Sequence, residues 1–171
     1  MNDAVEPVRL RAFTEADLPF LDRLSTDPEA LGEFESPGLI DPRTHRRRWE
    51  RDGFISAESS AVAVVNADDV VIGMATWKPR GVPAGVTSEI GIAILPEHRG
   101  RKLGMAAQKV LIDYLFSHTT VHRIEALTNE GNIGEQKALE RLGFTQEGFL
   151  RERSFIGGKY LGVYIYALLR P

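Results

Sequence analysis

The sequence predicts an α/β (α+β) fold with a central mixed, mostly antiparallel sheet of about six to seven strands, flanked by about four helices. Three features of the chain support this fold class. Short apolar or alternating segments recur along its 171 residues and end at turn-forming residues such as glycine, proline and asparagine. Neighbouring segments are joined by tight turns, as in β-hairpins. An amphipathic stretch separates two such segments near the middle of the chain, which indicates a βαβ passage.

The N-terminal half is expected to contain a strand, two helices and a hairpin. Alternation over residues 8–13 predicts the first strand, and Thr14 with Asp17 forms a capping-box pattern before a helix. Helically spaced leucines continue that helix to Asp27-Pro28, where the proline ends it. The other expected elements are a loop over 32–42, a helix over 42–52, strands over 61–65 and 70–77 joined by a turn, and a loop over 78–85.

The C-terminal half is expected to alternate strands with helices and to end in a second hairpin. An apolar stripe from Leu103 to about Phe116 repeats at helical spacing and predicts a helix. Gly143 is placed to terminate a shorter helix, and Gly157-Gly158 is placed to form a hairpin turn. The other expected elements are strands over 87–95, 123–128, 144–155 and 160–169, and a helix over 134–142.

The composition, with 43% hydrophobic and 26% charged residues, is typical of a soluble globular protein, and the length suggests one domain over residues 1–171. A net charge of −3 gives no general attraction to nucleic acid. The absence of cysteine excludes disulfides, thiolate metal sites and a cysteine-linked intermediate, and the four histidines have no metal-ligand spacing. We see no signal peptide or membrane span, so we expect a cytoplasmic protein without a membrane partner or a metal.

Residues 90–106 are the most informative part of the chain. An apolar strand ends at Pro96, a short basic loop containing glycine follows, and an amphipathic helix starts directly after it. The backbone N–H groups of such a loop can converge at the helix N-terminus, where the helix dipole favours an anion. Arg99, Arg101 and Lys102 add positive charge. A phosphate or pyrophosphate group is therefore the expected ligand of this loop.

Several segments also fit one family pattern in their order and spacing. These segments are Leu10-Arg11-Ala12-Phe13-Thr14, Glu89-Ile90-Gly91, residues 96–106, Asn132 to Phe144 with its ending Glu140-Arg141-Leu142-Gly143-Phe144, and Tyr166-Ala167-Leu168-Leu169-Arg170. Together they resemble the GNAT superfamily of acetyl-CoA-dependent N-acetyltransferases, in particular the ribosomal-protein N-terminal acetyltransferase (RimJ/RimL) type, over nearly the whole chain. The family loop reads Gln/Arg-x-x-Gly-x-Gly/Ala, whereas Lys102 here replaces its first glycine, and lysine tolerates a positive φ poorly.

The resemblance implies the GNAT fold, with acetyl-CoA as cosubstrate and no metal. It implies that Ile92, Ala93 and Ile94 pair with the pantetheine arm through backbone groups, like an added strand. Asn132 would bind the cosubstrate near its thiol end, and the alternative for Asn132 is a turn or N-cap residue. The pyrophosphate would be held by the loop residues Arg99, Gly100, Arg101, Lys102, Leu103, Gly104 and Met105.

Transfer of an acetyl group to an amine needs a base, because an alkyl ammonium ion is not a nucleophile at neutral pH. Glu89 is the first candidate, since its strand is expected to flank the cosubstrate, and the alternative is an ion-paired or solvated glutamate. Glu125 is the second, at a position where some N-terminal acetyltransferases carry a base, and its alternative is an ion pair with Arg123 or Arg151. Without cysteine, direct attack in a ternary complex is the simplest route.

The group that would protonate the departing thiolate is less evident. Many relatives carry a serine or a tyrosine in the helix after the cosubstrate-binding asparagine, where this chain has Glu135 and Leu139. Glu135 can donate a proton only if its pKa is strongly raised. The other possibilities are Tyr164, Tyr166, a water molecule, or no acid at all, because a thiolate is a tolerable leaving group.

The leading hypothesis is acetyl-CoA-dependent transfer to a primary amine, either a protein N-terminus or a small molecule, by a monomer or homodimer. The alternative is a catalytically silent CoA-binding module, which the missing serine and tyrosine motivate. A nucleotide-binding protein of another kind is disfavoured, because the chain lacks Gly-x-x-x-x-Gly-Lys-Ser/Thr and has no Gly-x-Gly-x-x-Gly after its first strand.

Overall fold

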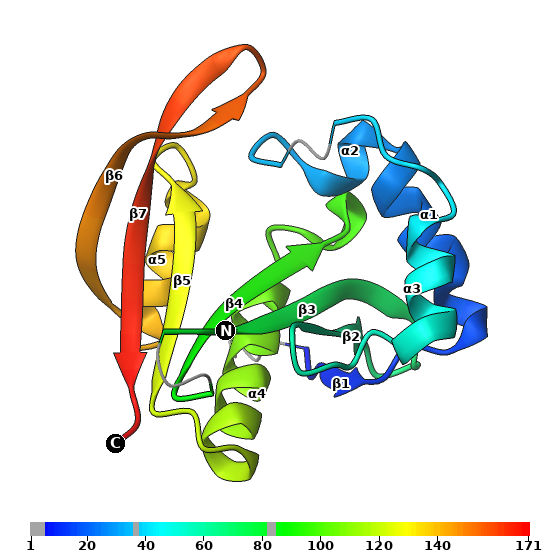
Figure 1. Cartoon of the computed structure of the whole chain (residues 1–171), viewed down its shortest axis with the longest axis horizontal. Coiled ribbons are helices and arrows are strands. Elements are labelled where there is room, and N and C mark those ends of the chain that lie inside the picture. Colours follow the sequence, from blue (N-terminus) through cyan, green and yellow to red (C-terminus); the bar gives the residue numbers. More distant parts are fainter. Residues whose placement is uncertain (1–5, 36–37, 82–84) are drawn as a thin grey trace.

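The computed structural model describes residues 6–35, 38–81 and 85–171 and contains a seven-stranded sheet (Figure 1). The strand order is β1-β2-β3-β4-β5-β7-β6, and every neighbouring pair is antiparallel except β4 and β5, which are parallel. The strands are β1 (Arg9–Arg11), β2 (Ser60–Val65), β3 (Val71–Arg80), β4 (Thr87–Ile94), β5 (Arg123–Asn129), β6 (Thr145–Ile156) and β7 (Lys159–Leu169). The mixed, mostly antiparallel sheet flanked by helices is therefore confirmed.

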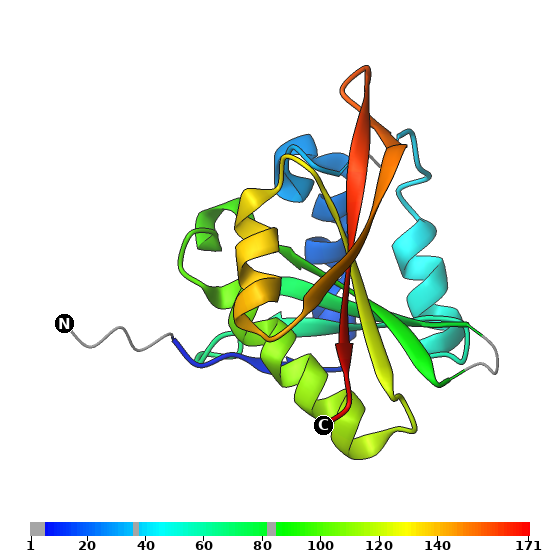
Figure 2. The same cartoon turned by 90° about the vertical axis from the view of Figure 1, so that its left-hand side faces the viewer.

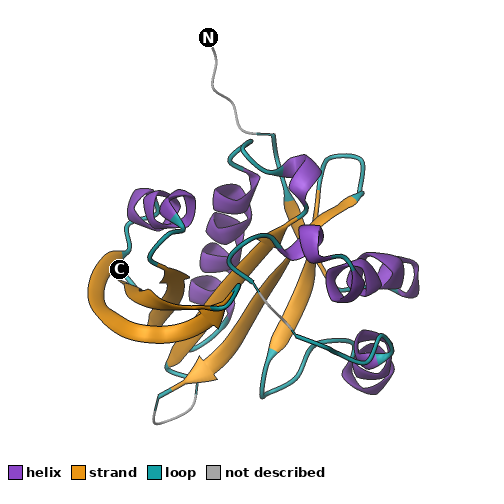
Figure 3. Ribbon diagram, turned by 90° about the horizontal axis from the view of Figure 1, so that it is seen from above, coloured by secondary structure: helices purple, strands orange, loops and turns teal. Residues whose placement is uncertain are grey.

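Helices cover both faces of the sheet (Figure 3). On one face, Leu21 of α1 packs into a cluster with Phe13, Phe54 and Ala63, and Trp49 of α3 lies against it. On the other face, buried residues of α4 and α5 pack with residues of β2 to β5 and β7. The helices are α1 (Leu18–Thr26), α2 (Pro28–Leu31), α3 (Thr44–Asp52), α4 (Leu103–His118) and α5 (Ile133–Arg141), with 3-10 turns at Glu15–Asp17 and Pro96–His98.

Two local predictions differ from the structure. The loop expected over 78–85 is wrong at its start, because β3 continues to Arg80 and pairs there with β4. Ion pairs from Lys78 and Arg80 to Glu89 stabilise this pairing despite Pro79, and residues 82–84 of the expected loop lie outside the described part. The short helix α2 was not expected, and the side chain of Asp27 caps it by accepting a hydrogen bond from the Glu29 N–H.

The parallel strands β4 and β5 separate before they end. Their ladder runs from Thr87 opposite Arg123 to Ile90 opposite Ala126, whereas β4 continues to Ile94. The other edge of β4 stays paired with β3 as far as Ile94. Figure 1 shows the two strands diverging from this point, and Figure 2 shows the β6–β7 hairpin projecting beyond the rest of the sheet on the same side. After Ile90, the edge of β4 that faces β5 therefore has no partner strand, and a gap opens between the two strands.

Candidate functional site

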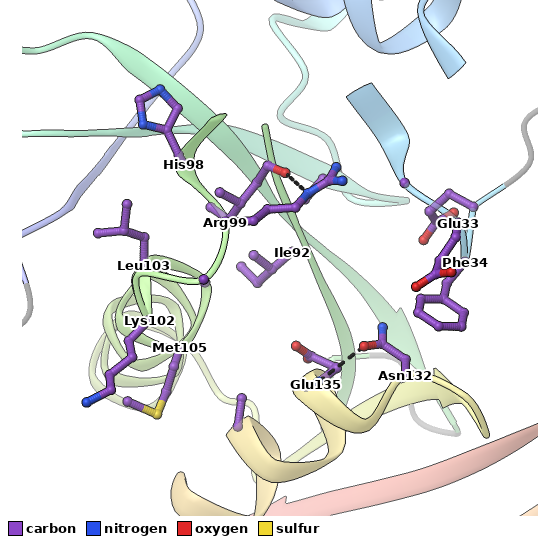
Figure 4. Close-up of a pocket in the computed structure, with 18 of the residues that line it drawn as sticks. Glu33, Phe34, Ile92, His98, Arg99, Lys102, Leu103, Met105, Asn132 and Glu135 are labelled. Atoms are coloured by element: carbon purple, nitrogen blue, oxygen red, sulfur yellow. Dashed lines mark hydrogen bonds between the residues drawn. The ribbon is translucent and has the colours of Figure 1, made fainter. Parts of the chain in front are cut away.

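A cavity of about 500 Å³ lies between the second half of β4, the N-terminal end of α4, α5, and the segment that follows α2 (Figure 4). All the residues predicted to bind the cosubstrate line it except Arg101. They come from separate parts of the chain: the β4 residues and the loop before α4 form one side, and Asn132 reaches the cavity from the start of α5. The fold thus brings the predicted binding residues together around one space.

The loop before α4 has the backbone form of a helix-terminal anion site. Gly100 and Lys102 have φ angles of 75° and 61°, and α4 then runs for 16 residues. The first hydrogen bond within this helix is donated by Ala106 N to Lys102 O at 3.1 Å. The N–H groups that precede it, at Leu103 and Gly104 among others, have no acceptor within the helix and carry its positive dipole end. This is the arrangement that a phosphate group needs.

Lys102 keeps the left-handed conformation that the family pattern assigns to glycine. This conformation is strained for a side chain with a Cβ atom, so we expect Lys102→Gly to raise the free energy of unfolding by about 1 kcal/mol and Tm by roughly 2–4 °C. Lys102→Met keeps the strained angle and should give no such gain. Thermal unfolding with and without acetyl-CoA measures both effects, and acetyl-CoA should still raise Tm in both variants if backbone amides hold the phosphate. A Lys102→Gly variant that is less stable than Lys102→Met would contradict the strain argument.

The two arginines of the loop have protein partners, and only Arg99 brings its positive charge to the cavity. Arg99 lines the cavity, but its Nε donates to Ile94 O at 2.7 Å and its Nη2 donates to Ala30 O at 2.6 Å. It therefore joins the end of β4 to α2. Arg101 points away from the cavity and forms an ion pair of 2.7 Å with Glu6.

A short segment after α2, residues 32–35, closes one side of the cavity, and we call it the strap. Its Phe34 carbonyl accepts a hydrogen bond from Asn129 Nδ2 at 3.3 Å. The Phe34 ring lies so close to the β5–α5 turn that a Cβ atom on Gly131 would be 3.0 Å from it. The contribution of Glu33, Phe34 and Glu35 to the site was not predicted, because nothing in a loop rich in glycine and proline indicates which distant residues it contacts.

Glu89 lies on the other side of β4 from this cavity, in a groove of about 120 Å³. Its side chain is 17% exposed and forms ion pairs with Lys78 Nζ at 2.8 Å and Arg80 Nη2 at 2.6 Å. Burial alone would raise the pKa of Glu89, but hydrogen bonds from these two cations outweigh it and lower the pKa. Gly91 lines both this groove and the gap between β4 and β5, so the two spaces are adjacent.

Glu125 lies directly opposite Glu89 in the β4–β5 ladder. Its Oε1 accepts from Arg123 Nε at 2.7 Å, which agrees with the ion-pair alternative, and Arg123 also pairs with Glu147. Glu125 lines neither the large cavity, nor the Glu89 groove, nor the cavity in the gap between β4 and β5.

Asn132 both caps α5 and lines the cavity. Its Oδ1 accepts from Glu135 N at 3.2 Å and so caps α5, as its alternative reading states, while the residue also lines the cavity. Glu135 faces the same space from the first turn of α5 (Figure 4), and Gln108 of α4 donates to its carboxylate. Gln108 was missed, although a polar residue within the buried stripe of a helix is a signal that the sequence contains.

Two further properties concern ligands and membranes. Within residues 6–35, 38–81 and 85–171, no group of three or more His, Cys, Asp or Glu side chains is arranged to hold a metal ion. None of the described helices has the length and apolar character needed to cross a membrane.

Comparison with known proteins gives the family. The sequence matches the acetyltransferase (GNAT) domain over residues 8–145. It is 29% identical over 168 residues to an uncharacterized N-acetyltransferase, p20 of Bacillus licheniformis, which covers 96% of this chain and 94% of the relative. It is 32% identical over 163 residues to the spermidine N(1)-acetyltransferase of Vibrio cholerae, which covers 90% and 88%.

A solved structure shows the same fold. The crystal structure of spermidine N-acetyltransferase from Vibrio cholerae in complex with CoA and spermine superposes with a TM-score of 0.84, at 24% identity and over 95% of each chain. These relatives confirm acetyl transfer from acetyl-CoA to an amine. They do not support the RimJ/RimL type in particular. The chain belongs to the GNAT family of acetyltransferases.

Proposed function

We propose that acetyl-CoA binds with its diphosphate at the N-terminus of α4 and its pantetheine arm along the free edge of β4. The observation that carries this proposal is the cavity itself, which joins an open helix N-terminus at Leu103 to the edge of β4 that has no partner strand, at Ile92 to Ile94. Pantetheine contains amide groups, and these can pair with a free strand edge as an added strand does. The thioester then lies where β4 and β5 separate.

We further propose that the acceptor is a small polycationic amine rather than a protein N-terminus. Two carboxylates, those of Glu33 and Glu35, line the part of the cavity that the strap forms. An acidic lining favours a substrate with more than one ammonium group. The relatives named spermidine N-acetyltransferases support this choice.

The proposed reaction is direct attack of the amine on the thioester. Glu89 is our first candidate for receiving the amine proton, directly or through water, because the groove that it lines reaches the gap at Gly91. Glu125 is the second candidate, because it lies opposite Glu89 in the β4–β5 ladder. It ranks second because its carboxylate already forms an ion pair with Arg123.

A panel of amines tests the acceptor class. With acetyl-CoA, we expect spermidine to give a kcat/KM at least about tenfold above that of peptides with a free N-terminus, because the carboxylates bind its additional charges. Free CoA release gives the rate, and mass spectrometry identifies the product. A preference for peptides would instead support the RimJ/RimL type, and binding of acetyl-CoA without turnover of any amine would support a silent CoA-binding module.

A further inference from the structure

A buried polar cluster lies deep in the gap between β4 and β5. It consists of Gln108 from α4, Thr128 from β5 and Glu135 from α5, and it lines a cavity of about 120 Å³. Gln108 is 1% exposed and Thr128 is 5% exposed. Asn132 and Glu135 line both this cavity and the larger one, so the cluster is next to the proposed position of the thioester.

The hydrogen bonds of this cluster are incomplete. Gln108 Nε2 donates to both carboxylate oxygens of Glu135, at 2.9 Å and 3.1 Å. Gln108 Oε1 and Thr128 Oγ1 are buried and have no hydrogen-bond partner among the described residues. Buried polar atoms are nearly always paired in folded proteins, and an amide oxygen can only accept, so Gln108 Oε1 indicates a donor that an ionised Glu135 does not supply.

A protonated Glu135 supplies that donor. An ionised carboxylate can only accept hydrogen bonds, whereas a carboxylic acid can donate its O–H to the amide oxygen of Gln108 while its carbonyl accepts from the amide N–H. Burial raises the pKa of Glu135, and the hydrogen bond from Gln108 opposes this increase only in part.

Other side chains near the site are poorly placed to donate a proton. Leu139, one turn further along α5, has no polar atom. Neither Tyr164 nor Tyr166 lines the two cavities that Glu135 lines, and Tyr166 is 1% exposed.

We propose that Glu135 is the acid that protonates the sulfur of CoA as it leaves, and that Gln108 is a positioning residue that holds its carboxyl group toward the gap. This inference rests on the proposed function. The amine nitrogen forms a bond to the thioester carbon, and the carbonyl electron pair moves to oxygen. When that pair returns, the C–S bond breaks, its electrons leave with sulfur, and the Glu135 proton joins them to give the CoA thiol. The Glu135 carboxylate then regains a proton from solvent, while the proton lost by the amine goes to the base.

Glu135 shares its two cavities with several titratable or charged groups. The titratable or charged groups that share its two cavities are Glu33 and Glu35 from the strap, His98, Arg99 and Lys102 from the loop before α4 and its N-terminus, and Arg141 from α5. Since the acid form is required, kcat should fall as pH rises through the pKa of Glu135.

Glu135→Gln tests the role of the acid, because the glutamine is similar in shape but has no acidic proton. We expect kcat to fall by about 30-fold, which is less than is common for acid catalysis because a thiolate leaves readily. We also expect the decrease in kcat at high pH, the alkaline limb of the kcat–pH profile, to disappear. Turnover is measured with the fastest amine of the panel, so the test does not depend on the polyamine proposal. Asp113→Asn, which changes an exposed carboxylate of α4 paired with Lys109, is the control and should keep the wild-type rate and limb.

Gln108→Leu tests the positioning residue separately. Gln108 lowers the pKa of Glu135, so its removal should raise that pKa and move the alkaline limb to higher pH. A merely structural role for Gln108 would lower Tm without moving the limb.

An infrared measurement needs no substrate. The carbonyl band of a protonated carboxyl group should be present at neutral pH in the wild type and in Asp113→Asn, and absent in Glu135→Gln. Absence of this band in the wild type overturns the proposal, as does a Glu135→Gln variant with kcat within about threefold of wild type and an unchanged alkaline limb. Failure to acetylate any amine, with the band present, would instead refute the proposed function, so the two failures are distinguishable.

Discussion

Glu89→Gln should lower kcat by about 10²–10³-fold and change the KM for acetyl-CoA by no more than about twofold. Glutamine keeps the shape and an accepting oxygen but cannot take the amine proton. Glu89 faces the groove beside Gly91 and not the proposed diphosphate site at α4, so binding of acetyl-CoA should remain. Initial rates at varied acetyl-CoA and saturating amine separate the two parameters.

The matched control is Glu147→Gln. Glu147 is an exposed glutamate that also accepts from an arginine, Arg123, but it lies on β6 and does not line the acetyl-CoA cavity, the Glu89 groove or the cavity between β4 and β5. It should keep wild-type kcat. Equal losses in the two variants would mean that removal of any ion-paired glutamate disturbs the sheet, and unchanged turnover of Glu89→Gln would remove Glu89 from the mechanism.

The ion pairs of Glu89 also predict how the difference in stability between wild type and Glu89→Gln depends on pH. Lys78 and Arg80 lower the pKa of Glu89 in the folded state despite its burial. A carboxyl group whose pKa is lowered by folding stabilises the native state above its unfolded pKa, and this contribution is lost as pH falls through the folded value. The stability difference between wild type and Glu89→Gln should therefore be present at neutral pH and disappear in acid.

The sequence was a good guide wherever function depends on contiguous residues. The predicted phosphate-binding loop is local, because strand, loop and helix follow one another within residues 90–106, and the residues predicted there to bind the cosubstrate line the cavity, apart from Arg101. The contribution of the strap was not predictable, because it depends on Phe34 reaching Asn129 and Gly131 across the fold. The ion pairs of Glu89 depend on how far β3 and β4 remain paired. That pairing was not predicted from the sequence, because Pro79 is typical of a loop.

The arginines show the limit of reasoning from charge alone. Residue type indicated three cations for a phosphate. In the structure Arg99 donates hydrogen bonds to two backbone carbonyls, and Arg101 forms an ion pair with Glu6. Likewise, the contact between Gln108 and Glu135 joins two helices whose relative position no local pattern specifies. Secondary structure follows from neighbouring residues, whereas the partners of polar side chains are set by packing between distant segments.

Gly73→Ala should destabilise the protein by about 3 kcal/mol or more and lower Tm by roughly 6–12 °C. A Cβ atom at Gly73 would lie 2.3 Å from the Ala93 carbonyl oxygen and 2.7 Å from Ile94 Cδ1. The first contact is with backbone, which cannot rotate away, so the second half of β4 must move. Ala93 and Ile94 form a wall of the acetyl-CoA cavity, and the increase in Tm on adding acetyl-CoA should be lost as well.

Gly104→Ala provides a matched control, since it adds the same methyl group next to the Ile94 side chain. There the new Cβ atom would be 3.6 Å from Ile94 Cγ1, which is an ordinary contact, and alanine favours the helix by about 0.5–1 kcal/mol. This variant should be as stable as wild type or more so. Thermal unfolding of the two variants therefore separates a clash with the β4 backbone from the general effect of replacing a buried or helical glycine. If Gly73→Ala unfolded at the wild-type temperature, β4 would be free to shift, and the close β3–β4 packing that we hold responsible for positioning the cavity wall would not be required.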